Sequence, residues 1–289
     1  MVRLRDRMLE DMKLRGLSAR TQEAYCQAVR QMVERVGKPP ARVTEEDLRG
    51  YFVYLRDGKK YARASFTIAL CGIRFFFEQT LGREWSLFDL VRPPKEKKLP
   101  VVLTGEEVRK ILGLIRIDVY RVCLTTIYSC GLRLTEGAHL KVSAVDSGRM
   151  TLLVHGKGGK DRYVPLPRRT LALLREHWVT HRSPEWLFPA PTRKGLDHAL
   201  AHGGGPVTRS SVQSAFRRAW KSSNISKHVG VHSLRHSYAT RLLESGVNLR
   251  LIQSYLGHGS ARTTQIYTHL TREIHEAAKD PINKLFADL

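Results

Sequence analysis

Cysteine, uninterrupted hydrophobic sequence and acidic side chains are all scarce in this 289-residue chain. The four cysteines form no CxxC pair and show no metal-ligand spacing, which excludes a disulfide framework and a cysteine-based zinc site as the basis of the fold. No window approaches ~18 consecutive apolar residues, and the N-terminal segment MVRLRDRMLEDMKLRG interrupts every apolar stretch with charge. We therefore expect a soluble, cytoplasmic protein with reduced, mostly buried thiols, without a signal peptide or a membrane span.

The shortage of acidic residues leaves a large positive charge. The chain has 49 Lys and Arg against 27 Asp and Glu, a formal net charge of +22. Duplex DNA carries one negative charge per ~1.7 Å, so such an excess favours a nucleic-acid partner. A generally basic soluble protein and an anionic membrane surface stay open on charge alone. With 42% hydrophobic residues, the chain has enough apolar surface for a packed core.

The first third of the chain has the signals of several short helices. Gly16 ends a first helix and Ser18 is placed to cap a second. Thr44 and Asp47 have the spacing of a capping box for a third. Aromatic and aliphatic residues at helical spacing between residues 62 and 81 predict a fourth. These signals predict a small helical bundle.

A change of pattern marks a second domain. The segment VRPPKEKKLPVV, residues 91–102, lacks periodicity and predicts a linker, and the length of the chain favours two domains. Helical periodicity then begins at the Thr104–Glu107 capping-box pattern and continues to a break at Gly131. MTLLVHG and DRYVPLP alternate and are joined by KGGK, which predicts a β-hairpin. We expect a mainly α fold with a small antiparallel β-sheet, divided into an N-terminal helical domain (1–90) and a C-terminal domain (103–289).

Residues suited to phosphodiester chemistry cluster near the end of the chain. VHSLRHSYATRLLESG, LGHGS and TTQIYTHL place His232, Arg235, His258 and Tyr267 close together in sequence. An arginine binds phosphate oxygens, imidazoles hold or move protons, and a phenol can attack phosphorus. His232 and His236 have the i, i+4 spacing of metal ligands, but no matching acidic residue lies between them. We expect no metal and no cofactor.

Five segments in order resemble one family, the tyrosine recombinases or phage-integrase family, and in particular its compact Xer-like members. They are YSCGLRLTEGAHL, VHGKGGKDRYVPLP, HSLRHSYAT, LGHGS and TTQIYTHL. They stand in the family's order, with similar spacings, across the region from Thr104 to Leu270, and the N-terminal helical region resembles the family's core-binding domain. The resemblance implies a site-specific DNA recombinase with a covalent 3′-phosphotyrosine intermediate.

The resemblance also implies roles for individual residues. Arg133 and Arg235 match the two arginines that bind the non-bridging phosphate oxygens, a task for which the planar guanidinium is suited. Tyr267 matches the nucleophile, with Tyr238 and Tyr255 as rival candidates nearby in sequence.

Four further residues complete the implied site. Lys157 matches the lysine that protonates the leaving 5′ oxygen, and Lys160 remains chemically competent for the same task. His232 matches a general base or proton shuttle, and His258 a histidine that binds the scissile phosphate. Glu136, three residues after Arg133, either orients that arginine or forms a surface pair with it.

The implied partner is double-stranded DNA. The resemblance implies four protomers, as a homotetramer or a hetero-tetramer with a paralogue, on two DNA sites, and a nucleoid-associated location. The tail from Thr271 onward would pack on a neighbouring protomer or on its own domain. Two alternatives remain open: a type IB topoisomerase-like enzyme that nicks and religates DNA, and a catalytically silent DNA-binding accessory protein.

Overall fold

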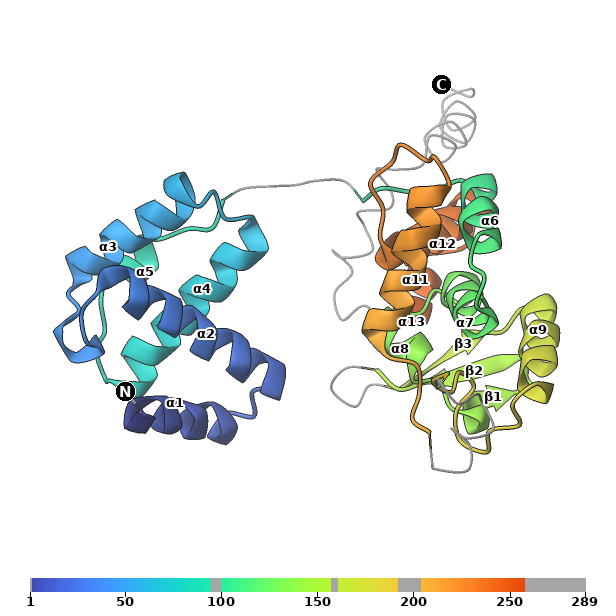
Figure 1. Ribbon diagram of the computed structural model, residues 1–289, viewed down its shortest axis with the longest axis horizontal. Coiled ribbons are helices and arrows are strands. Elements are labelled where there is room, and N and C mark those ends of the chain that lie inside the picture. The colour runs from blue at the N-terminus through green and yellow to red at the C-terminus, as the bar shows by residue number, and fades with distance from the viewer. Residues whose placement is uncertain (1, 95–99, 157–160, 192–203, 258–289) are drawn as a thin grey trace, which may run out of the picture. The chain divides into compact units, whose positions relative to one another are not determined.

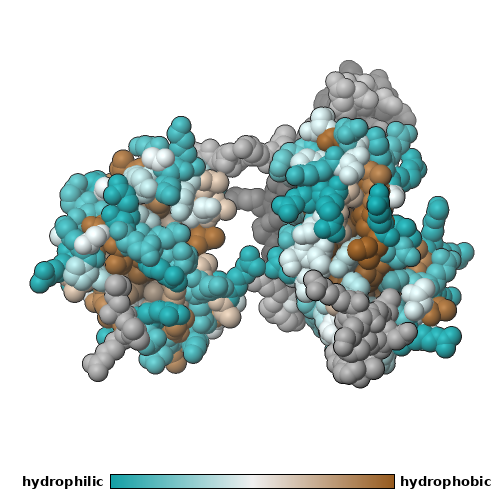
Figure 2. Space-filling view, in the orientation of Figure 1, coloured by the Kyte–Doolittle hydropathy of each residue, from teal (hydrophilic) through white to brown (hydrophobic). Residues whose placement is uncertain are grey.

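The computed structural model describes residues 2–94, 100–156, 161–191 and 204–257. The chain forms two compact units, Met1–Lys98 and Leu99–Leu289 (Figure 1). The described residues are mostly helical, with one three-stranded antiparallel sheet in the second unit. The predicted fold class is confirmed. Hydrophilic residues cover most of the visible face of each unit, with smaller hydrophobic patches between them (Figure 2).

The end of the first helix and the start of the second lie where the sequence predicts. α1 (Val2–Leu14) is followed by Gly16 with a φ of +67°, a conformation that glycine adopts without strain. The hydroxyl of Ser18 accepts a hydrogen bond of 3.3 Å from the backbone N–H of Thr21 and so caps α2 (Ala19–Val36). Both predicted signals are confirmed.

The third and fourth helices each end in a turn of π-helix. The Thr44–Asp47 capping box is present at the start of α3. The predicted helix at residues 62–81 is α4 followed by the π-helical segment η3, which the periodicity alone did not predict. The remaining elements of this unit are η1 (Pro40–Arg42), α3 (Glu45–Val53), η2 (Tyr54–Gly58), α4 (Arg63–Phe75), η3 (Phe76–Thr80) and α5 (Leu87–Leu90).

The core of the first unit is formed by the crossing of α2 and α4. Gly72 allows the close approach, because a Cβ atom at that position would lie only 3.0 Å from the Cα of Tyr25. The buried rings of Phe66, Phe76 and Phe77 belong to the same hydrophobic cluster. The aromatic cluster predicted from residues 62–81 therefore serves packing.

The second unit opens with two helices where a single periodic run was predicted. That prediction is wrong, because the chain leaves the helix after Gly113 and re-enters it at Asp118. Ile115, in the connection, is buried, so the connecting loop contributes to the core and keeps the apolar periodicity. The predicted Thr104–Glu107 capping box is confirmed. The elements before the sheet are α6 (Gly105–Gly113), α7 (Asp118–Ser129), α8 (Leu134–Ala138) and η4 (Val142–Ala144).

The sheet has the order β1-β2-β3, with every neighbouring pair antiparallel. β2 (Thr151–Val154) and β3 (Arg162–Pro165) are the predicted hairpin. β1 (Val145–Asp146) was not predicted, because two residues carry no detectable alternation. The register pairs Val154 with Arg162, the last residue of β2 with the first of β3.

The remaining helices assemble around α7. α9 and α12 contact α7, α11 contacts α6 and α7, and α13 contacts both α12 and β3. The contact with β3 brings the end of α13 close to the start of that strand. These helices are α9 (Arg168–Val179), α11 (Arg209–Ser222), α12 (Val231–Glu244) and α13 (Leu249–Leu256).

The four cysteines are free thiols. Cys123 and Cys130 are buried, whereas Cys26 and Cys71 are partly exposed, so burial is less general than predicted. Burial raises the pKa of Cys130 to about 12, which leaves that thiol protonated and unreactive. Among the helices that the structure describes, none combines the length and apolarity that a membrane span requires.

Candidate active site

The structure places four of the predicted site residues. Arg133 is the N-cap residue of α8 and Glu136 lies in its first turn, while His232 and Arg235 lie on α12. Three others lie outside the described residues, namely Lys157, His258 and Tyr267. Lys160 and the tail from Thr271 also lie outside them.

Arg133 and Glu136 contact each other twice. The carboxylate of Glu136 accepts the backbone N–H of Arg133 at 2.8 Å and its guanidinium Nη1 at 2.7 Å. Only 5% of the Glu136 side chain is exposed, so the surface-pair alternative is excluded. The contact fixes the guanidinium of Arg133 at the start of α8.

Arg162, the first residue of β3, binds the same carboxylate. Its Nη1 and Nη2 donate to Oε1 and Oε2 of Glu136 at 3.0 and 2.8 Å, a bidentate arrangement. The sequence reasoning missed this residue. The sequence signal that could have found it is the alternation of side chains along the strand. Arg162 and the buried Val164 are two residues apart in β3 and therefore lie on the same face. A charge on the inward face of a strand requires a buried partner.

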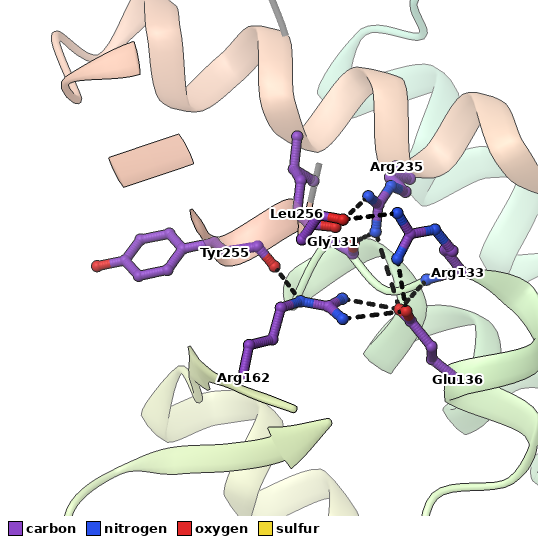
Figure 3. A network of polar contacts seen from close by, with 8 residues as sticks. Gly131, Arg133, Glu136, Arg162, Arg235, Tyr255 and Leu256 are labelled. Atoms are coloured by element: carbon purple, nitrogen blue, oxygen red, sulfur yellow. Dashed lines mark hydrogen bonds and ion pairs between the residues drawn. The ribbon is translucent and has the colours of Figure 1, made fainter. Parts of the chain in front are cut away.

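Arg235 extends from α12 to the same place and is almost completely buried, with 1% of its side chain exposed. Its Nη1 donates to the carbonyl oxygen of Gly131 at 2.8 Å and lies 3.8 Å from Oε2 of Glu136, and its Nη2 donates to the carbonyl oxygen of Leu256. Figure 3 shows the guanidiniums of Arg133, Arg162 and Arg235 converging on the one carboxylate.

The electrostatics of this group follow from its composition of three guanidiniums and one carboxylate. Burial alone would raise the pKa of Glu136, but the hydrogen bonds and charges of Arg162 and Arg133 outweigh it and hold the pKa at about 2. Glu136 is therefore ionised at neutral pH, and the four side chains carry an excess of positive charge. Such a group suits an anionic ligand with several oxygens, such as a phosphodiester.

His232 lies one turn before Arg235 on α12. Its side chain is exposed, and its ring centroid lies 4.6 Å from that of His236. Partial desolvation, and then the positive charges of Arg235 and Arg133, lower the pKa of His232 below its ordinary value of 6.5. The imidazole is consequently neutral at pH 7 and able to accept a proton.

A cleft of about 470 Å³ opens beside the arginines. Arg133 and Glu136 line one part of it, and His139, Lys141 and His155 line another. Its wall includes the end of β2, which precedes Lys157 in the chain. The cleft therefore joins the arginine group to the hairpin predicted to carry the general acid.

The rival tyrosines are poorly placed for attack on a bound phosphate. The ring of Tyr255 points away from the three guanidiniums (Figure 3). Tyr238 packs against Gly131, and desolvation, with smaller effects from Cys130 and Tyr255, raises its pKa. The Tyr255 ring thus lies away from the arginine group, and the raised pKa of Tyr238 makes its phenol harder to ionise.

No group of three or more His, Cys, Asp and Glu side chains in the described part of the chain has the arrangement of a metal site. The described residues offer three guanidiniums that can bind an anion and, on the same helix as Arg235, a neutral imidazole at His232 that can accept a proton.

Two family profiles match the chain. The one described as phage integrase family matches residues 101–273, and the one described as phage integrase, N-terminal SAM-like domain matches residues 4–87.

Curated relatives match most of the chain. An integrase/recombinase of Sinorhizobium fredii is 41% identical over 287 residues, covering 99% of this chain and 90% of the relative. The tyrosine recombinase XerD of Mycobacterium tuberculosis is 32% identical over 295 residues, covering 91% of this chain and 93% of the relative. The tyrosine recombinase XerC of Halalkalibacterium halodurans is 35% identical over 244 residues, covering 81% and 80%.

Solved structures share the fold. A lambda integrase dimer bound to a COC′ core site matches with a TM-score of 0.72 at 20% identity, covering 92% of this chain and 76% of that chain. The XerH recombinase bound to its difH substrate matches with a TM-score of 0.68 at 24% identity, covering 93% and 81%.

Proposed function

This chain belongs to the phage integrase family and is a tyrosine site-specific recombinase, and from that premise we propose that it cleaves and rejoins DNA through a covalent 3′-phosphotyrosine on Tyr267. The observation that carries the proposal is the convergence of Arg133 and Arg235 on Glu136, with His232 on the same helix as Arg235. Segments far apart in sequence thus form one anion-binding group.

The arginines act on the scissile phosphate. Its two non-bridging oxygens gain negative charge as phosphorus becomes five-coordinate, and Arg133 and Arg235 stabilise that charge. Because Glu136 and backbone carbonyls already fix both guanidiniums, little reorganisation is needed when the substrate binds. His258 adds a hydrogen bond to the phosphate in this proposal.

In the chemical step one bond to phosphorus forms as another breaks. One proton leaves the nucleophile, and one proton reaches the leaving group. The phenol oxygen of Tyr267 bonds to phosphorus as the bond from phosphorus to the 5′ oxygen breaks. His232 accepts the phenol proton, and Lys157 donates a proton to the departing 5′ oxygen, with Lys160 as the alternative donor. Religation reverses the step with a 5′ hydroxyl as nucleophile. The phosphotyrosine conserves the bond energy, so no cofactor is required.

The two units divide the binding of DNA in this proposal. The helical domain at residues 1–90 and the catalytic domain at 103–289 each hold one side of a duplex, joined by the linker at 91–102. XerH and lambda integrase have been solved bound to DNA, and lambda integrase as a tetramer on a Holliday junction. We extend to this chain a tetramer on two DNA sites, homomeric or with a paralogue, in which the tail from Thr271 docks on a neighbour. The site of action would be the nucleoid, in the cytoplasm.

Trapping on nicked DNA tests the mechanism. A suicide substrate releases a short fragment after cleavage, so the covalent complex accumulates and is seen by denaturing electrophoresis. We expect an adduct with the wild type and with Tyr255→Phe, and none with Tyr267→Phe. An adduct with Tyr267→Phe, or none with the wild type on DNA of its own inverted-repeat site, overturns the proposal.

Relaxation of a plasmid without that site separates the alternatives. Cleavage that depends on a defined inverted repeat marks a recombinase, whereas relaxation of any supercoiled plasmid by a monomer marks a topoisomerase-like activity. The DNA recovered from covalent complexes also identifies the target sequence.

A further inference from the structure

We propose that Arg162 is a positioning residue: it offsets the charge of Glu136 and caps the end of α13, and thereby holds Arg133 and Arg235 correctly placed for the scissile phosphate. The inference rests on the proposed function, because it assigns those two arginines to phosphate binding. It concerns a residue outside the set implied by the family resemblance.

The first observation is the hydrogen bonding at the end of α13. The last carbonyls of a helix have no partner within the helix and must find one elsewhere. The backbone N–H of Gly257 donates a hydrogen bond to the carbonyl oxygens of Gln253 and Ser254. Each of the next three carbonyl oxygens accepts a hydrogen bond from an arginine. Nε of Arg162 donates to Tyr255 O at 2.7 Å, and Nη2 of Arg235 donates to Leu256 O. Nη2 of Arg133 donates to Gly257 O at 2.9 Å.

The site arginines are thereby tied to the chain that leads onward to His258 and Tyr267. Arg162 holds the first of the three carbonyls, at the point where α13 meets β3. Its side chain also packs against Gly257, since a Cβ atom there would lie 3.0 Å from Cδ of Arg162. Gly257 has a φ of +61°, a conformation that favours glycine and turns the chain out of the helix. Arg162 thus supports this turn.

The second observation is the balance of charge. Arg162 engages both oxygens of Glu136, with only 9% of its side chain exposed. Arg133 uses one side-chain nitrogen for this carboxylate, and Arg235 lies 3.8 Å from it. Three guanidiniums thus face one carboxylate, and Arg162, which occupies both of its oxygens, contributes to the excess of positive charge that the group offers to a phosphate. Without Arg162, the carboxylate would face Arg133 and Arg235 alone and compete with the phosphate for them.

A purely structural ion pair and a positioning residue differ in their response to a second substitution. If Arg162 acts by balancing Glu136, its loss leaves an uncompensated buried carboxylate, and removing that carboxylate restores part of the activity. If Arg162 only stabilises the fold, removing the carboxylate restores stability, as for any buried ion pair, and the cleavage rate of the folded protein does not change between Arg162→Gln and the double variant.

The experiment compares Arg162→Gln, Arg162→Lys and the double variant Glu136→Gln/Arg162→Gln with the wild type on suicide DNA. Arg149→Gln is the matched control, because Arg149 precedes β2 in the same unit and its side chain is 79% exposed. DNA affinity is measured by equilibrium binding, and the cleavage rate constant at saturating DNA.

For Arg162→Gln we expect DNA affinity within about threefold of the wild type and a cleavage rate roughly 100-fold lower, the loss typical of a misplaced charge-stabilising group. Arg162→Lys keeps the charge without the bidentate geometry and should cleave at an intermediate rate. The double variant should cleave at least about tenfold faster than Arg162→Gln, whereas Arg149→Gln should match the wild type.

Two results overturn the inference. One is cleavage by Arg162→Gln at the rate of Arg149→Gln. The other is a double variant no faster than Arg162→Gln. If the single glutamine variant does not fold, cleavage by Arg162→Lys at the rate of Arg149→Gln overturns the inference instead. Failure of the proposed function is distinguishable from both, since the wild type would then form no covalent adduct.

Discussion

The guanidinium of Arg162 and the carboxylate of Glu136 face each other at 3.0 and 2.8 Å, across 26 residues of sequence and at the junction of β3 and α8. Most of the organisation of the site follows from this pair. Glu136 binds Arg133 at the start of its own helix and Arg235 from α12, and Arg162 offsets its charge. One buried carboxylate thus assembles an anion site that retains a positive charge.

Substitution of Glu136 should destabilise the second unit in a pH-dependent way. The folded pKa is about 2 and the ordinary value 4.5, so ionised Glu136 contributes stability above pH 4.5 that is lost as the pH falls toward 2. Glu136→Gln should cost about 3 kcal/mol at pH 7, a fall in Tm of roughly 6–12 °C for this unit. The difference from the wild type should narrow between about pH 5 and pH 2 in urea titrations.

The control for that prediction is Glu176→Gln, a change to an exposed carboxylate on α9. It should leave both Tm and the pH dependence unchanged. A Glu136→Gln protein as stable as the wild type at neutral pH would show that the arginines do not need the carboxylate.

The pH dependence of cleavage should report the neutral form of His232. A base of lowered pKa is already unprotonated at pH 7, so the cleavage rate should fall only as the pH drops below 6.5, through the pKa of His232. Single-turnover cleavage at saturating DNA should show this acid limb. His232→Gln should remove the limb and lower the rate at pH 7 by roughly 10²–10⁴-fold.

His228→Gln provides the comparison, since His228 is exposed and packs edge to face on Trp220 away from the arginines. That variant should keep the limb of the wild type. If the cleavage rate of His232→Gln still fell below pH 6.5 as in the wild type, the titrating group would be a residue other than His232.

Features set by local sequence could be predicted. The two capping boxes depend on residues three apart, and their side chains and backbone meet as soon as a first helical turn forms. The hairpin of β2 and β3 follows from alternation on either side of a glycine-containing turn. Such signals require no knowledge of distant parts of the chain.

Features set by contacts between distant segments could not be predicted. The alternation of β3 places Arg162 on the inward face of the strand, but nothing in the neighbouring sequence indicates that its partner is Glu136. Similarly, Ile115 lies in the loop between α6 and α7 and is buried in the core. The apolar spacing therefore continues through the loop, and the sequence pattern does not reveal that the helix is broken there. The family resemblance supplied the candidate residues but not the network that holds them.

Gly131 should tolerate no side chain. Its φ is +63°, and a Cβ atom would lie 2.4 Å from the ring of Tyr238. Gly131→Ala therefore combines backbone strain of about 1–2 kcal/mol with overpacking of about 1–3 kcal/mol. Because the carbonyl oxygen of Gly131 accepts from Arg235, we expect cleavage to fall as well as Tm.

Gly246→Ala separates these effects. Gly246 has a φ of +78°, and a Cβ atom there would meet no distant atom of the described residues within 4 Å, so only the backbone strain applies. We expect a loss of about 1–2 kcal/mol without a change in the cleavage rate of the folded protein. Equal losses in the two variants would mean that Tyr238 moves aside without cost.

Two buried histidines should make the second unit sensitive to acid. His177 and His181 are buried with ring centroids 4.8 Å apart, and the Nε2 atom of each lacks a hydrogen-bond partner among the described residues. Desolvation, and then the proximity of His181, lower the pKa of His177 to about 4, against an effect of Asp118 in the other direction. The folded pKa lies below the unfolded value of 6.5, so stability is complete above pH 6.5 and is lost as the pH falls toward 4.

Replacing the buried imidazole should remove that sensitivity. His177→Leu eliminates a buried polar atom without a partner among the described residues and should be neutral or slightly stabilising at pH 7. Between pH 6.5 and 4 the wild type should lose up to about 3 kcal/mol more than this variant, as measured by urea unfolding at each pH. His228→Leu, at an exposed position, should follow the wild type across the same range. Parallel pH profiles for the wild type and His177→Leu would contradict the prediction, because the acid loss would then arise from other groups.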